Sequence, residues 1–123
     1  MAIPLNEFKT RTAKLVSKPV GGFIGDSDVI YTTPNGITAI VLMAQAANTS
    51  ETDIHNVTFQ HYDTTSEVTT NVVKNFEVQP NDAAGLVTGK LIVEQNNQMR
   101  AFTEDSSGEE INFIFSFLQA LNG

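Results

Sequence analysis

Apolar and polar residues alternate with a period of two along most of this chain, and no other feature constrains the fold as much. From Ile111 to Phe117, every second residue is large and apolar. Successive side chains of a β-strand point to opposite faces, whereas an α-helix repeats its apolar positions every three or four residues. Valine and threonine, which favour strands, are frequent throughout. The alternation therefore predicts an all-β protein.

Turn-forming sequences divide the chain into about eight predicted strands. The strongest hairpin signal is Pro34-Asn35-Gly36, because proline presets φ and Asn-Gly accepts positive φ. A second Gly- and Pro-rich stretch, residues 18–26, is expected to be a connection without regular structure. Strands are expected at residues 8–16, 28–33, 37–47, 55–62, 68–78, 86–94, 98–103 and 110–121. This spacing predicts a two-sheet antiparallel β-sandwich or a jelly-roll-like arrangement.

Composition narrows the class of protein. With 41% hydrophobic and 17% charged residues among 123, the chain has enough apolar content for one folded domain. The net charge of −7 opposes a phosphate-binding surface, so nucleic acid is not expected as a partner. The longest apolar run, residues 37–47, is about half of a membrane span, so no membrane partner is expected either. We see no secretory signal and expect synthesis in the cytoplasm.

The first 18 residues differ in charge from the rest of the chain. They hold four basic residues against Glu7, a net of 4 − 1 = +3, whereas residues 19–123 hold 3 − 13 = −10. We therefore divide the chain into an extended arm and connection at 1–26 and a sandwich at 27–123. Either the arm is a solvated strand face, or it docks onto an acidic partner such as a neighbouring copy. The basic residues are Lys9, Arg11, Lys14 and Lys18.

The strand at 110–121 is apolar on both faces. Ile111, Phe113, Phe115 and Phe117 are predicted to enter the core. Ile114 and Leu118 point the other way, and they are covered either by the N-terminal segment or by another subunit. The segment 37–47 is also apolar on both faces, so we place it centrally in a sheet or at an interface.

No constellation of residues indicates catalysis, a cofactor or a metal site. His55 and His61 share a predicted strand face but lie about 20 Å apart at strand rise, too far to share a metal. The acidic residues of 26–28 and 104–110 suggest at most a weak cation contact. A glycan-binding sandwich is the main alternative from another class, but it usually offers exposed aromatic rings. This chain has no tryptophan and two tyrosines, Tyr31 and Tyr62.

The segment 29–50 resembles a pattern found in small virion proteins of tailed bacteriophages. In those proteins a Tyr-x-x-Pro-x-Gly turn leads into a long apolar strand and then an Asn-rich loop, as from Tyr31 onwards here. The turn Pro80-Asn81-Asp82 and the strand–turn–strand unit at 89–101 are similar to theirs. Residues 4–10 resemble proteins of this kind in T4-like phages of marine cyanobacteria.

This resemblance implies a β-sandwich subunit of the virion, present in many copies and without catalytic residues. A capsid decoration subunit is expected first, and a neck, collar or tail component second. The expected partners are further copies of the chain, the major capsid protein or other virion proteins. From the residues themselves, the expected interface consists of Phe8, Lys9, Arg11, Lys14, Ile114 and Leu118.

Overall fold

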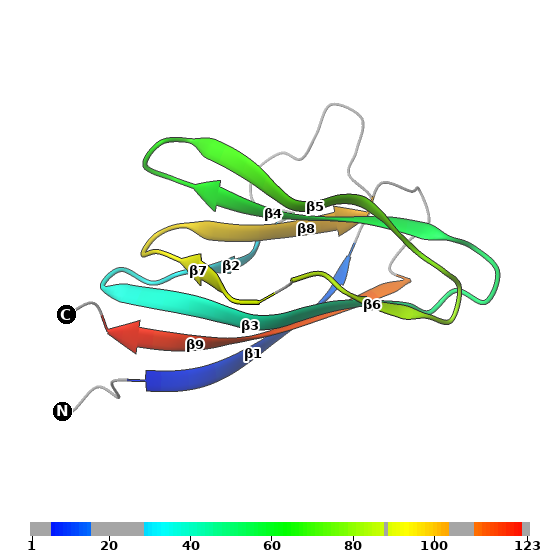
Figure 1. The fold of residues 1–123 in the computed structure, drawn as a ribbon, viewed down its shortest axis with the longest axis horizontal. Helices are drawn as coiled ribbons and strands as arrows, with labels where there is room; N and C mark the ends of the chain where they lie inside the picture. Colours follow the sequence, from blue (N-terminus) through cyan, green and yellow to red (C-terminus); the bar gives the residue numbers. More distant parts are fainter. Residues whose placement is uncertain (1–5, 16–28, 88, 104–109, 122–123) are drawn as a thin grey trace.

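A computed structural model describes residues 6–15, 29–87, 89–103 and 110–121, and these residues form nine β-strands and no helix. The strands make two antiparallel sheets that lie as two layers (Figure 1). Sheet A has the order β1-β9-β3-β6, and β7 also pairs with β3. Its strands are β1 (Asn6–Leu15), β9 (Ile111–Leu121), β3 (Ile37–Asn48), β6 (Ala83–Gly85) and β7 (Leu91–Val93). The predicted all-β sandwich is thereby confirmed.

Sheet B has the order β2-β8-β4-β5. Its strands are β2 (Val29–Thr32), β8 (Gln98–Thr103), β4 (His55–Asp63) and β5 (Val68–Val78). Pro34-Asn35-Gly36 does form a turn, in which the Ile37 amide donates to the Pro34 carbonyl at 3.2 Å and Gly36 has φ +80°. However, β2 pairs with β8 while β3 belongs to the other sheet. The expectation of a hairpin here is wrong, because the turn carries the chain from one layer to the other.

Residues 6–15 of the predicted arm are the edge strand of sheet A. Strand β1 pairs antiparallel with β9 of the same chain, from Asn6 opposite Ala120 to Leu15 opposite Ile111. It lies along one margin of the lower layer in Figure 1. The sandwich therefore includes part of the segment that we set apart from it. Residues 1–5 and the connection at 18–26 lie outside the described residues.

The core forms between the inner faces of the two sheets. The inward residues of β9 are at most 1% exposed, as its alternation predicted. Their rings continue into sheet B, since Tyr31 lies 4.3 Å from Phe117 and Phe59 lies 5.2 Å from Phe113, centroid to centroid. Burial of each such side chain stabilises the fold by roughly 1.5–3 kcal/mol. The inward set is Ile111, Phe113, Phe115 and Phe117.

Strand β3 lies between β9 and the short strands β6 and β7, so its predicted central position is correct. The prediction of one strand over residues 86–94, in contrast, is wrong. Among the described residues of that segment, only Leu91–Val93 pairs as a strand, and Ala83–Gly85 forms another before it. The apolar run is interrupted at Gly89, whose φ of +77° is incompatible with an extended strand.

Candidate functional site

The outer face of sheet A carries four large apolar side chains in one row, which we call the apolar ridge. In the strand register, Phe8 lies opposite Leu118, Leu118 opposite Ile40, and Ile40 opposite Ile92. The residues that flank Leu118, Ile40 and Ile92 on their own strands include fully buried ones, so these three point away from the core. The ridge therefore crosses β1, β9, β3 and β7 without a break.

The ridge is exposed at both of its ends. Phe8 is 75% exposed and Ile92 is 59% exposed. Beside the ridge, a bulge in β3 sets Leu42 and Met43 outward together, between the buried Val41 and Ala44. Large apolar side chains gathered on one face mark an interaction surface more often than scattered ones do.

Towards the other end of the same face lies a hollow of about 610 Å³, which we call the apolar hollow. Small side chains create it, because Ala47 lies opposite Asn112 where the ridge has Ile40 opposite Leu118. Ile114 and Gln45 face each other across its floor. The full lining is Thr12, Ala13, Lys14, Gln45, Ala47, Asn112, Phe113 and Ile114.

Charge is nearly absent from the three long strands of this face. Among the outward positions of β1, β9 and β3, Lys14 is the one charged residue, and it lies at the hollow. The protein as a whole carries a net charge of −7. The outer face of sheet A is therefore close to neutral on an acidic molecule.

The basic residues of the N-terminal segment do not form one patch, because alternation along β1 separates them. Lys9 and Arg11 lie opposite the inward residues Phe117 and Phe115, while Lys14 lies opposite Asn112 on the outer face. Lys9 pairs with Glu7 on its own strand. The Arg11 guanidinium lies 5.9 Å from the ring centroid of Tyr31 and covers the open margin of the core. Lys18 lies outside the described residues.

The outer face of sheet B is polar and its side chains pair with one another. The Gln60 amide donates to Asn71 at 2.9 Å, and Arg100 donates to Gln98 at 2.9 and 3.2 Å. The Arg100 guanidinium also lies 4.0 Å from the centre of the Tyr62 ring. Tyr31, in contrast, is buried in the core. Neither tyrosine thus offers the free ring that a glycan platform would use.

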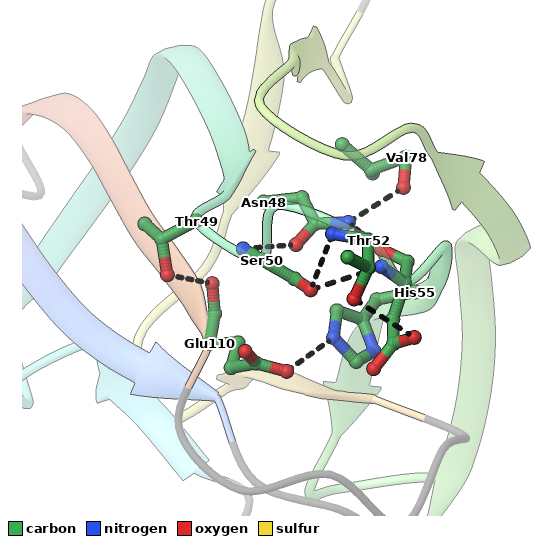
Figure 2. Close-up of polar contacts among 8 residues, drawn as sticks. Asn48, Thr49, Ser50, Thr52, His55, Val78 and Glu110 are labelled. Atoms are coloured by element: carbon green, nitrogen blue, oxygen red, sulfur yellow. Dashed lines mark hydrogen bonds and ion pairs between the residues drawn. The ribbon is translucent and has the colours of Figure 1, made fainter.

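A second candidate site is the polar cluster at the end of the sandwich, which Figure 2 shows. His55, 2% exposed, begins β4, and its Nε2 lies 2.9 Å from a carboxylate oxygen of Glu110. The Thr49 hydroxyl and amide both donate to the Glu110 carbonyl. These contacts fasten the loop after β3 to the start of β9.

Asn48 and Ser50 organise the same loop. The Asn48 side chain donates to the carbonyls of Asp53 and Val78 and accepts from the Ser50 amide. The Ser50 hydroxyl oxygen accepts from the amides of Thr52 and Asp53. The Ser50 hydroxyl oxygen thus stabilises the turn by accepting these hydrogen bonds. This is a structural role, and it differs from that of a serine activated as a nucleophile. The cluster joins β3 of sheet A to β5 of sheet B.

Metal and membrane sites were sought in the described part of the chain. It holds no group of three or more His, Cys, Asp or Glu side chains that could bind a metal ion. It also contains no helix of the length and apolarity needed to cross a membrane. The acidic residues at 26–28 and 104–109, which suggest at most a weak cation contact, lie outside the described residues.

The structure brings four residues of the expected interface, Phe8, Lys14, Ile114 and Leu118, onto one outer face and adds Ile40 and Ile92 to them. The apolar character of both faces of 37–47 was the available signal for Ile40. For Ile92 the only signal was the short apolar run 91–93.

Comparison with known proteins adds no family: no protein-family model matches this sequence, and no curated protein matches it either.

Proposed function

We propose that this chain is a non-enzymatic structural subunit of a tailed-bacteriophage virion, in the first place a capsid decoration subunit. The observation that carries the assembly role is the outer face of sheet A, where the apolar ridge and the apolar hollow lie on a nearly uncharged surface. An isolated subunit exposes this apolar surface to water, and contact with another protein removes it from water.

The virion part of the proposal is supported by the sequence resemblance at 29–50, 80–82 and 89–101. In this proposal the N-terminal segment contributes as the edge strand β1, since residues 6–15 pair with β9. Phe8, Ile114 and Leu118 contribute apolar contacts and Lys14 contributes the single charge. Lys9 and Arg11 lie on the other side of β1, at the edge of sheet A. An exposed ion pair between either residue and a partner contributes only about 0–1 kcal/mol.

Protein quantification in purified virions of the phage that encodes the chain tests this proposal. Hundreds of copies for each particle would support a capsid decoration subunit, and a dozen or fewer would support a neck, collar or tail component. Absence from particles that infect normally would overturn the virion role altogether.

A binding assay separates decoration from incorporation during assembly. Purified protein added to particles that lack it should bind, because a decoration subunit attaches to a finished shell. Ile92→Glu should reduce the amount bound, while Val68→Glu, a similar change on an exposed residue of sheet B, should not. Equal binding by both variants would show that the outer face of sheet A is not used.

A further inference from the structure

We propose that the outer face of sheet A binds a second copy of this chain, and that the apolar ridge of each copy fills the apolar hollow of the other. The inference rests on the proposed function, because it names the partner and the surface through which the subunit assembles. It is carried by the opposite shapes at the two ends of this face: large side chains at one end and small ones at the other.

Two-fold symmetry makes such a face self-complementary. In a two-fold contact, both copies use the same patch, so each protrusion must meet a depression of the same surface. Between the ridge and the hollow lies a row in which Thr10 is opposite Ser116, with their hydroxyls 3.3 Å apart, and Ser116 is opposite Met43 at the bulge of β3. A two-fold axis along this row, across the strands, places each ridge over the other copy's hollow.

At the two margins of the face, a large side chain of one copy then meets a small residue of the other. Two residues from the axis on the ridge side are Phe8, Leu118 and Ile92, while at the same distance on the hollow side are Thr12, Ile114 and Gly85. Phe8 thus lies over Thr12 of the second copy. Ile92 lies over Gly85, where an added Cβ would meet no atom within 4 Å. Large groups are therefore seated on small ones along β1 and β7, and along β9 Leu118 meets Ile114 of the other copy in an apolar contact.

Charge also favours a second copy over a charged partner. Lys14 and its counterpart in the other copy lie four residues from the axis on opposite sides, about 26 Å apart at strand rise. That separation exceeds the Debye length of about 8 Å, so the two cations do not oppose the contact. Each Lys14 then lies over Asn6 of the other copy, which carries no charge. Two chains of net charge −7 repel each other least at a nearly neutral face.

The area available is in the range of a specific dimer. Three strands of about ten residues, β1, β9 and β3, together with the three-residue strands β6 and β7, give a flat footprint of roughly 570 Å² at about 4.8 Å between strands and about 3.3 Å per residue. The accessible area of a surface with a ridge and a hollow is larger than its flat footprint. A standard interface buries about 800 Å² of accessible surface on each partner.

Light scattering and sedimentation equilibrium of the purified full chain test the inference. We expect a dimer at a protein concentration of about 0.1 mM, and dissociation on dilution. Ile92→Glu should raise the dissociation constant by more than about tenfold. Val68→Glu is the matched control, since Val68 is 51% exposed on sheet B, and its dissociation constant should equal that of the wild type. A wild-type monomer, or equal effects of the two variants, would overturn the inference.

Two further variants test the orientation of the copies. The chain has no cysteine, so Thr10→Cys introduces one thiol next to the proposed axis. A short bis-maleimide should link two such chains, but not two Thr69→Cys chains, in which the thiol lies on sheet B. Phe8→Glu should weaken the dimer, and adding Thr12→Lys should restore it, because each new carboxylate then faces a new ammonium group of the other copy. Failure of the double variant to recover association would overturn the ridge-to-hollow orientation.

The outcomes separate this inference from the proposed function. A monomer that is abundant in virions would overturn the two-fold contact and leave the virion role supported. A dimer that is absent from virions would support the two-fold contact and overturn the virion role.

Discussion

The two sheets share one core but differ on their outer faces. On sheet B, polar side chains pair with one another, as Gln60 with Asn71 and Arg100 with Gln98. On sheet A, the corresponding positions carry the apolar ridge. Folding the sandwich requires only that the inner faces be apolar. The outer face is therefore free to reflect what each sheet contacts, which is water for sheet B and, in our proposal, protein for sheet A.

The largest effect on stability is expected from a substitution in the core between the two sheets. Phe115→Ala should destabilise the protein by about 3–5 kcal/mol, because Phe115 is fully buried between sheets and the change leaves a cavity. Urea unfolding measures this loss. Phe8→Ala on the outer face is the matched control and should cost less than about 1 kcal/mol in the monomer. Similar losses at the two positions would mean that inner and outer faces are not distinct.

A smaller loss is expected at the link between the sheets. Asn48→Ala removes the side-chain amide that donates hydrogen bonds to the carbonyl groups of Asp53 and Val78. The loss should lower the free energy of unfolding by roughly 2–3 kcal/mol. Asn71→Ala, an exposed asparagine on the outer face of sheet B, should change the same quantity by less than about 0.5 kcal/mol. If Asn48→Ala proves as mild as its control, the polar cluster does not hold the sheets together.

Exchanging the character of the outer faces should alter solubility more than stability. Ile92→Thr makes sheet A more like sheet B, and Gln60→Ile does the opposite. Each should change the unfolding free energy by about 0.5 kcal/mol or less. Ammonium sulfate precipitation should need more salt for Ile92→Thr and less for Gln60→Ile than for the wild type. Shifts in the same direction would contradict the difference between the faces.

The smallest effect concerns a turn of sheet B and depends on pH. The Ser66 and Thr65 amides donate to Asp63 and lower the pKa of its carboxyl group below the ordinary 3.8. A lowered pKa in the folded state means stability that is present above pH 3.8 and lost as the pH falls through the folded pKa. Asp63→Asn should therefore be less stable than the wild type at pH 7, and the gap should shrink as the pH falls below 3.8. A gap that stays constant with pH would exclude this role of the charge.

Local sequence patterns predicted much of this structure. The alternation in 110–121 placed the inward residues of β9 correctly, because side-chain direction along a strand depends only on position. The same rule applied to Lys9, Arg11 and Lys14 shows that they cannot lie on one face, although their joint positive charge suggested a single patch. The prediction of a strand at 86–94 was wrong because the apolar residues of this segment favour a strand, whereas Gly89 has a positive φ that interrupts it.

The ridge could not be predicted, because it depends on long-range pairing. Phe8 and Leu118 become neighbours only when β1 pairs with β9, and Ile92 joins them only through the register of β7 on β3. Register is set by tertiary packing, which a single sequence does not display. The alternation could assign Leu118 to an outer face, but not name the residues beside it.

The position of β9 has a consequence for how the protein folds during synthesis. The ninth strand in sequence lies between the first and the third in sheet A. A ribosome therefore releases β1 and β3 before the strand that joins them exists. Closing a contact such as Asn6 with Ala120 has a large entropic cost, so pairing across most of the chain is intrinsically slow. Until β9 emerges, sheet B can pair its strands while β1 has no partner, which exposes the nascent chain to capture by chaperones or by other copies.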